Sequence, residues 1–425
     1  MATVGDRSQG TTEDDHHHLP HPDVHEVERW ALEGVLSTLA LAWTALVIVV
    51  ALAIAWPETT ARFPGVAPLV RDTTSWALLI ALVGVGLGVI AKLGGARHVG
   101  PITAGACVLG TIVVLAPIVG MWRIASEHGA SISLFENLEK VTNTGYPVPE
   151  RSVTYATIDG QELALDVWVP GSTTAAPAPV TAGAAPRPAV VMVHGGGWVT
   201  GDRGTVPLWN QLLNDRGYAV FDIQYRLATP STPRWDQAAG DVLCAVGWVK
   251  AHAGDYGIDP ARVALMGESA GGELVLQAAY GTGGKPTAPT CPTPDPSVRA
   301  VVSFYPGTEF VSLWQSDSAM GFMRPWVEAY QGGTPDAVPA HYDASSPVRQ
   351  AKAGVPPTLV LHGLEDDTVP VEQTTQLSDV LSGVGADHEE ITLPLMEHAF
   401  DHSWHSLGTQ VARDVVPRYL AQHLG

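Results

Sequence analysis

A serine stands between two glycines in residues 263–272, which read V-A-L-M-G-E-S-A-G-G. The spacing Gly267-x-Ser269-x-Gly271 is typical of a nucleophile elbow, a strained strand-to-helix turn that presents a serine hydroxyl at the edge of a sheet. The chain has 44 glycines, so the motif alone could be an ordinary turn. The apolar strand before it and the helix-forming run at 273–280 favour the elbow. Ser269 is therefore the candidate nucleophile.

A serine hydroxyl is a weak nucleophile and needs a neighbouring base that a carboxylate orients. Acidic side chains follow the predicted strand 358–361, within residues 362–370, which read H-G-L-E-D-D-T-V-P. Glu365, Asp366 and Asp367 compete for the role. We assign it to Asp366 for its position in H-G-x-x-D-x-x-V-P, although chemistry alone does not separate it from Asp367.

The candidate base is His398, which comes directly after the last predicted strand, 388–393. His402 and His405 are expected on the following helix, 402–423. A lone loop histidine is usually a solvated surface residue. Here the order serine, aspartate, histidine along the chain matches a catalytic triad, which favours the functional interpretation.

Three consecutive glycines follow another apolar strand, 189–194, in the sequence H-G-G-G-W at 194–198. Such a run exposes backbone N–H groups without side chains in the way, and it commonly accompanies the elbow as an oxyanion hole. We expect the donors to be Gly195, Gly196 and Ala270, the residue after the nucleophile. The alternative is a merely flexible turn.

Three apolar runs precede these motifs, at 32–56, 74–93 and 102–124. Each has about the 20 residues needed to cross a bilayer. Only 16% of the residues are charged and the mean hydropathy is +0.12, which is typical of a chain with a membrane-embedded part. The first run is too long, and its flank too acidic, for a cleaved signal peptide. We expect a membrane region at 29–125, with the lipid bilayer as a partner.

Three spans would place the polar tail 1–28, expected to be disordered, and the C-terminal part on opposite sides of the membrane. The basic residues at the two ends of the spans are nearly balanced, so the positive-inside rule leaves both orientations open. We favour a cytosolic tail and an extracytoplasmic catalytic domain, from the shortness of the 92–97 loop and the cysteines described next. The basic residues are Arg29, Lys92 and Arg97 at one end, and Arg62, Arg71, Arg123 and Lys140 at the other.

The formal net charge of −20 argues against a nucleic-acid partner, because such a partner requires a basic surface. The three cysteines have no metal-ligand spacing. Cys107 lies in an apolar run, whereas Cys244 and Cys291 could pair in an oxidising compartment. Two buried free thiols are the simpler expectation. The histidines at 16–18, 21 and 25 are expected in a solvated tail, so no metal is predicted.

After a connector at 126–150, strand and helix patterns alternate through a domain at 151–425. The hairpin dipeptide Asp159-Gly160 separates the first two strands. Alternation of this kind predicts an α/β fold with a mostly parallel sheet covered on both faces. A flexible surface loop is expected at 171–188. The predicted strands are 152–158, 162–169, 189–194, 218–224, 262–267, 298–305, 358–361 and 388–393, and the predicted helices are 206–215, 235–253, 270–280, 371–384 and 402–423.

Residues 153–424 resemble the α/β-hydrolase carboxylesterases of the hormone-sensitive-lipase-like and BD-FAE-like group. The resemblance rests on the segments above together with Y-R-L-A at 225–228 and D-P-A-R-V at 259–263. It implies an α/β-hydrolase fold and ester cleavage through an acyl-enzyme, without a cofactor. This sequence departs from the family pattern at three places. Such enzymes often carry aspartate where this chain has Glu268, usually proline-acid-histidine where it has residues 229–231, and often glycine where it has Ala399.

The resemblance also implies that the insertion at about 309–353 covers the active site as a cap. Its aromatic residues could line a substrate pocket or form the core of the cap. The pocket candidates are Trp314, Phe322 and Trp326 of the insertion, together with Trp198 after the glycine run. The sequence thus predicts a membrane-anchored serine hydrolase acting on small-molecule or lipid-like esters. An acyltransferase, peptidase or formamidase would use the same triad, and a non-catalytic membrane ligand-binding module is a further alternative. The motifs specify neither acyl length nor oligomeric state.

Overall fold

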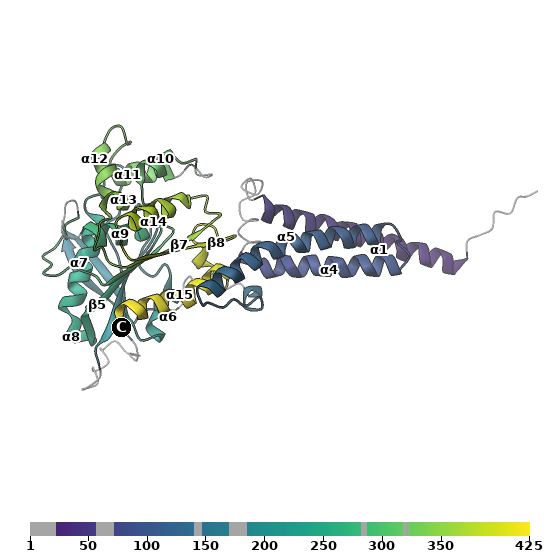
Figure 1. Cartoon of the computed structure of the whole chain (residues 1–425), viewed down its shortest axis with the longest axis horizontal. Helices are drawn as coiled ribbons and strands as arrows, with labels where there is room; N and C mark the ends of the chain where they lie inside the picture. Colours follow the sequence, from purple (N-terminus) through teal and green to yellow (C-terminus); the bar gives the residue numbers. More distant parts are fainter. Residues whose placement is uncertain are drawn as a thin grey trace, which may run out of the picture.

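The structure, a computed structural model, describes residues 23–56, 72–139, 147–169, 185–281, 287–317, 321 and 323–425. Within these ranges the chain forms a bundle of long helices and an α/β domain at one end of the bundle (Figure 1). The bundle helices are α1 (Val24–Ala55), α4 (Thr74–Leu93) and α5 (Val99–Glu127), and each is long and apolar enough to cross a membrane.

Small residues let the bundle helices approach one another. A Cβ added to Gly88 of α4 would lie 2.5 Å from the backbone nitrogen of Ala104 on α5, so only glycine fits there. Close backbone approach through glycine is how helices associate in lipid, where no hydrophobic effect drives them together. The large apolar side chains of α1, α4 and α5 remain exposed on the outside of the bundle, where a bilayer would solvate them.

The first helix begins earlier than the sequence suggested. The Asp23 side chain accepts a hydrogen bond from the backbone N–H of His25, and α1 starts at Val24. The expected disordered tail 1–28 is therefore wrong for residues 24–28, because an aspartate cap and the N–H groups of the first turn stabilise the helix there. Residues 1–22, with the other tail histidines, lie outside the described residues.

The α/β domain contains an eight-stranded sheet in the order β1-β2-β4-β3-β5-β6-β7-β8. Strands β1 and β2 form an antiparallel hairpin, with Asp159 and Gly160 both at positive φ as the dipeptide predicted. From β4 through β8 neighbouring strands are parallel. The strands are β1 (Arg151–Ile158), β2 (Gln161–Trp168), β3 (Arg187–Val193), β4 (Ala219–Ile223), β5 (Ile258–Glu268), β6 (Ala300–Phe304), β7 (Thr358–Gly363) and β8 (His388–Leu393).

Both faces of the sheet are buried, which explains the nearly continuous apolar strands. In β3, Ala189, Val191 and Val193 join one core cluster, whereas Val190 and Met192 join the other. The first cluster lies under α7 (Ala238–Ala251), α8 (Ala253–Tyr256), α9 (Ala270–Gly281) and α14 (Glu372–Gly383), and the second under α6 (Pro207–Asp215) and α15 (Leu407–Leu424).

The last helix starts at Leu407, not at residue 402 as expected. Ser406 caps it by accepting the N–H of Thr409, and a short 3₁₀ turn, η2 (Phe400–His402), precedes it. His402 and His405 consequently lie in the loop between β8 and α15. This loop, residues 394–406, also carries His398.

Cys244 and Cys291 form a disulfide, so the expectation of two free thiols is wrong. The segment before β6 lies flat on α7 because two glycines of that helix leave room for it. A Cβ on Gly240 would meet the carbonyl oxygen of Ala288 at 2.4 Å, and one on Gly247 would meet Thr293 at 2.2 Å. Packing across 47 residues of chain brings the two sulfurs together.

In the described part of the insertion between β6 and β7, four short helices lie above the sheet (Figure 1). They are α10 (Phe310–Gln315), α11 (Met323–Gln331), α12 (Pro339–Ser345) and α13 (Pro347–Gln350). The loop expected at 171–188 lies mostly outside the described residues, because 170–184 are not described; β3 already begins at Arg187.

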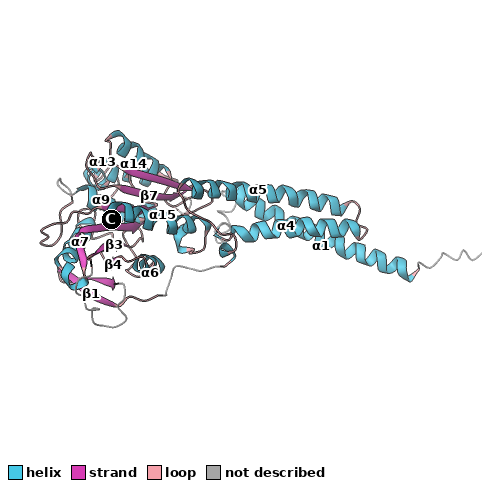
Figure 2. Cartoon of the chain, turned by 60° about the horizontal axis from the view of Figure 1, so that its bottom comes forward, coloured by secondary structure: helices cyan, strands magenta, loops and turns pink. Residues whose placement is uncertain are grey.

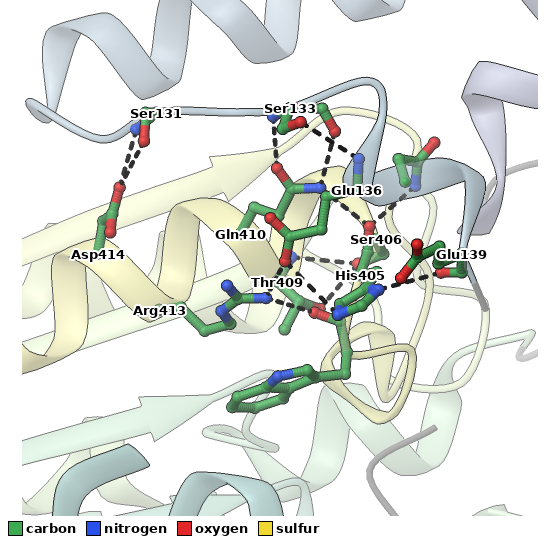
Figure 3. A network of polar contacts seen from close by, with 12 residues as sticks. Ser131, Ser133, Glu136, Glu139, His405, Ser406, Thr409, Gln410, Arg413 and Asp414 are labelled. Atoms are coloured by element: carbon green, nitrogen blue, oxygen red, sulfur yellow. Dashed lines mark hydrogen bonds and ion pairs between the residues drawn. The ribbon is translucent and has the colours of Figure 1, made fainter. Parts of the chain in front are cut away.

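The connector after α5 is bound to the domain along α15 (Figure 3). The Asp414 carboxylate accepts from the backbone N–H and the hydroxyl of Ser131, and Gln410 accepts from the N–H of Ser133. Within the connector, η1 (Glu136–Leu138) brings Glu136 into an ion pair with Arg413. These contacts attach the helix bundle to the α/β domain.

Candidate active site

Ser269 occupies the turn between β5 and α9. Its φ is 53°, a left-handed conformation that is uncommon for a residue with a side chain. The turn holds because the serine N–H donates to the carbonyl of Phe304 at 2.9 Å. A Cβ on Gly267 would lie 2.4 Å from the Gly271 oxygen, and one on Gly271 would lie 2.1 Å from the Val193 oxygen. The backbone is thus as crowded as the glycine spacing predicted.

The three residues assigned from sequence meet at the carboxyl edge of the sheet. Nε2 of His398 lies 2.9 Å from Oγ of Ser269, and Nδ1 of His398 lies 2.7 Å from Oδ2 of Asp366. The ring of Tyr305 meets the imidazole edge-on, with centroids 4.6 Å apart. Asp367, the rival candidate, is exposed and outside this line.

The loop after β7 holds Asp366 from several sides. Its Oδ1 accepts the backbone N–H groups of Thr368 at 2.9 Å and Val369 at 2.8 Å. The fully buried His362 places Nε2 3.2 Å from Oδ2. Burial by itself raises the pKa of the Asp366 carboxyl, but the charges and hydrogen bonds of His398 and His362 outweigh it and hold that pKa well below its usual range. Asp366 is therefore ionised at neutral pH.

A cavity of about 260 Å³ opens beside the serine. The glycine run forms one wall of it, and a Cβ on Gly195 would lie only 3.3 Å from the Cβ of Ser269. Gly196 and Gly197 have φ of 112° and 57°, so this wall needs glycine. Ala270 begins α9, and the first N–H groups of a helix lack intrahelical partners.

Of the four pocket candidates, Trp326 lines the cavity together with Met323. Trp198 is buried instead, where it stacks on Tyr330 and donates to Glu273 at 2.8 Å. Trp314 donates to Glu328 within the cap. These two tryptophans form core and cap packing and do not line the cavity, which corrects that assignment.

The remaining pocket candidate, Phe322, lies outside the described residues.

Sequence reasoning missed a polar cluster beside the nucleophile. Nε2 of His402 lies 3.5 Å from Oε2 of Glu268, and both residues line the cavity. Asp401 lies next to them and accepts hydrogen bonds from Trp209 at 2.8 Å and from Tyr305. The sequence pattern placed His402 on a helix and so did not bring it near the site. The one sequence signal for the cluster was the position of Glu268, directly before Ser269.

Electrostatics keep protons on this cluster at neutral pH. Burial and the Asp401 carboxylate raise the pKa of Glu268 to about 8. Burial lowers the pKa of His402, but its hydrogen bond to Glu268 and the negative charge that Glu268 and Asp401 share outweigh burial and raise that pKa to about 9. The ligand atoms of the three residues lie within 4.8 Å of one another and could hold a cation. Both oxygens of Asp401 already accept hydrogen bonds, from Trp209 and Tyr305. Protons on the cluster, rather than a bound cation, therefore balance the charge of the Glu268 and Asp401 carboxyls.

Residues 179–381 match the BD-FAE family model. LipM, a probable carboxylic ester hydrolase of Mycobacterium tuberculosis, is 35% identical over 246 residues, which cover 56% of this chain and 56% of LipM. Esterase LipQ of the same organism is 29% identical over 266 residues, covering 60% of each chain. The match therefore spans little more than half the length of these curated relatives.

Among solved structures, esterase 2 of Thermogutta terrifontis, phosphoramylated by tabun, aligns with a TM-score of 0.52 and 22% identity. The alignment covers 65% of this chain and 96% of that chain. At this identity the likeness shows a common fold. The expected α/β-hydrolase fold, with its mostly parallel sheet, is thus confirmed for the part of the chain that follows the helix bundle.

Proposed function

We propose, from the premise that this chain carries an α/β-hydrolase domain of the BD-FAE family, that the protein is a membrane-anchored serine hydrolase that cleaves carboxylic esters. The observation that carries the proposal is the continuous line from Ser269 through His398 to Asp366, with contacts of 2.9 and 2.7 Å. The names of LipM and LipQ support an ester as the substrate.

Acylation begins when Oγ of Ser269 attacks the carbonyl carbon of the ester and its proton passes to Nε2 of His398. The carbonyl electron pair moves to the oxygen, which becomes an oxyanion. The N–H groups of Gly195, Gly196 and Ala270 are the proposed donors to it, and each such donor lowers the barrier by about 3 kcal/mol. The intermediate then expels the alcohol oxygen, which takes the proton from Nε2.

Deacylation repeats these steps with water. Water gives a proton to Nε2 of His398 and its oxygen bonds to the acyl carbon. Collapse of this second oxyanion breaks the bond to Oγ of Ser269, which recovers the proton, and the carboxylic acid leaves. In both half-reactions the ionised Asp366 faces Nδ1, so it stabilises the imidazolium and fixes the ring orientation.

The helix bundle supports membrane anchoring, because α1, α4 and α5 are each long and apolar enough to cross a bilayer. We place the α/β domain outside the cytoplasm. The disulfide between Cys244 and Cys291 supports that side, since disulfides persist in oxidising compartments. Protease accessibility of the domain in intact cells, with and without permeabilisation, tests the orientation.

The catalytic proposal is tested on the full chain with short p-nitrophenyl esters and a fluorophosphonate probe. We expect hydrolysis and labelling of the wild type, and neither for Ser269→Ala. The matched control is Ser382→Ala on α14, an exposed serine away from the cavity, which should keep both. A folded wild-type protein that neither labels nor hydrolyses any ester would refute the proposal and favour a ligand-binding module.

A further inference from the structure

Tryptophans mark one level along the helix bundle. Trp56 follows α1, Trp76 lies in the first turn of α4 and Trp122 lies near the end of α5, all at the end of the bundle next to the α/β domain (Figure 1). They are 46% to 63% exposed. Tryptophan concentrates where hydrocarbon meets water. The surface of a bilayer around the bundle would therefore lie at this level, against the α/β domain.

The edge strand β8 runs toward that surface. At its start, Glu389 lies 2.7 Å from His128, which follows α5. Just past its end, the ring of Pro394 lies 3.6 Å from the Cβ position of Gly120, more than two turns earlier in α5. Strand β8 is thus antiparallel to the last turns of α5 and ends beside Gly120, two residues before Trp122 in that helix. Figure 2 shows α5 reaching the α/β domain on the side of β7, the neighbour of β8.

The other parallel strands share this direction. Strands β5, β6 and β7 are parallel to β8, so their carboxyl ends point the same way, within the twist of the sheet. Ser269 follows β5, Asp366 follows β7 and His398 follows β8. Of the three strand ends that carry the triad, that of β8 lies against α5, so His398 lies on the side of the domain next to the bundle.

Hydrogen bonds fix the loop with His398 at this level. The buried side chain of Asn137 donates to the carbonyls of Asp72 at 2.7 Å and His405 at 3.0 Å, and it accepts from the N–H of Ser75 at 2.9 Å. One amide thereby joins the start of α4 to the 394–406 loop. Nε1 of Trp76 also donates to the carbonyl of the residue after Asn137. The loop cannot move away from the membrane surface without breaking these bonds.

We propose that the active site takes its ester directly from the bilayer, as an amphiphile whose acyl chain lies in the hydrocarbon and whose ester group lies at the lipid headgroups. This inference rests on the proposed function and adds the substrate class. The cavity of about 260 Å³ is below the ~300–1,000 Å³ of sites that enclose drug-sized ligands. A long chain would therefore remain mostly in the lipid while Met323 and Trp326 contact the carbons next to the ester.

The energetic reason is the cost of extraction. Moving a long acyl chain from lipid into water is strongly unfavourable, because it exposes every methylene of the chain to water. An active site far from the membrane could meet such an ester only after this transfer. A site at the headgroup level requires only lateral diffusion of the ester.

The test uses the full chain in nanodiscs of ether-linked phosphatidylcholine, whose lipids contain no carboxylic ester. Methylumbelliferyl palmitate is loaded either into the discs that hold the protein or into separate empty discs, at equal total concentration. We expect hydrolysis at least tenfold faster when ester and protein share a disc, and a rate per enzyme that survives tenfold dilution of the sample. Equal rates from shared and separate discs would overturn the inference.

Methylumbelliferyl acetate, which dissolves in water, separates this inference from the proposed function. If the acetate is hydrolysed but the palmitate shows no preference for shared discs, only the bilayer inference fails. If neither ester is hydrolysed and Ser269 is not labelled by a fluorophosphonate, the proposed function fails.

Introducing a negative charge on the connector tests whether the active site lies at the bilayer surface. Phe135 is 86% exposed and precedes η1, beside the start of α4. Phe135→Glu should repel the domain from the bilayer and lower the shared-disc rate at least threefold, with acetate hydrolysis unchanged. Val148→Glu is the matched control, since Val148 is 73% exposed but lies before β1, at the opposite edge of the sheet from β8. Equal effects of the two variants on the shared-disc rate would contradict the proposed placement.

Discussion

Replacing Asp366 with asparagine tests both the triad and the choice between two neighbouring acids. The fully buried carboxylate lies 2.7 Å from Nδ1 of His398. In the proposed mechanism its charge stabilises the imidazolium that forms as Ser269 loses its proton. Two unit charges about 4 Å apart interact with about 4 kcal/mol at an effective dielectric constant of about 20. At 1.36 kcal/mol per factor of ten, this is a loss of about 10³ in kcat. An asparagine N–H₂ facing Nδ1 would also favour the wrong tautomer, which extends the expected loss to about 10⁴.

The assay is steady-state hydrolysis of a short p-nitrophenyl ester by the full chain in detergent. The matched control is Asp367→Asn, since Asp367 is exposed and its change should alter kcat by less than about twofold. Near-UV circular dichroism checks the fold of Asp366→Asn, whose remaining oxygen can still accept from the N–H groups of Thr368 and Val369. If folded Asp366→Asn kept more than a tenth of the wild-type kcat, or if Asp367→Asn lost as much, the assignment of the triad acid would be refuted.

Three further predictions concern stability. The pKa values of Glu268 and His402 rise from 4.5 to about 8 and from 6.5 to about 9 on folding. The folded protein therefore holds protons that the unfolded chain releases, and stability should fall as the pH rises from about 5 to about 9. Glu268→Gln should flatten this fall in the unfolding temperature, and parallel pH profiles for the two proteins would contradict it. Replacing both Cys244 and Cys291 with serine should lower the free energy of unfolding by about 4 kcal/mol relative to the disulfide-bonded wild type, because the disulfide closes a loop of 47 residues. Denaturant titration measures this change, and the reduced wild type should be as unstable as the double variant. Asn137→Ala removes three hydrogen bonds and should cost about 3 kcal/mol, at about 1 kcal/mol each; a change in unfolding free energy below about 1 kcal/mol would show that this amide does not hold the bundle to the domain.

The sequence was most informative where short-range geometry restricts the residue type. The elbow needs glycine at 267 and 271 because backbone oxygens lie within 2.4 Å of any added Cβ. The Asp159-Gly160 turn needs two residues at positive φ. Apolar runs of the right length predicted α4 with its bounds at 74–93. In each case the constraint acts within a few residues, so the spacing of residue types is enough to reveal it.

Most of the errors arose where contacts between segments distant in the sequence determine the structure. Histidines 402 and 405 lie in a loop because Ser406 caps α15, although the sequence pattern allowed a longer helix. The Cys244 disulfide exists because the segment before β6 folds onto α7. Trp198 is a core residue because Tyr330 of the cap stacks on it. The partners of Cys244 and Trp198 are distant in the sequence, whereas the cap at Ser406 is local.

By itself, the sequence determined the elbow serine, the glycine run, the order of acid and base after them, and the three apolar helices. The tertiary structure decided that Asp366 rather than Asp367 faces His398, that Glu268 meets His402 beside Ser269, and that the end of β8 lies against α5. The physical reason is the order of the strands: a sheet brings the ends of β5, β7 and β8 to one edge, and distances between side chains more than a hundred residues apart exist only once that order has formed.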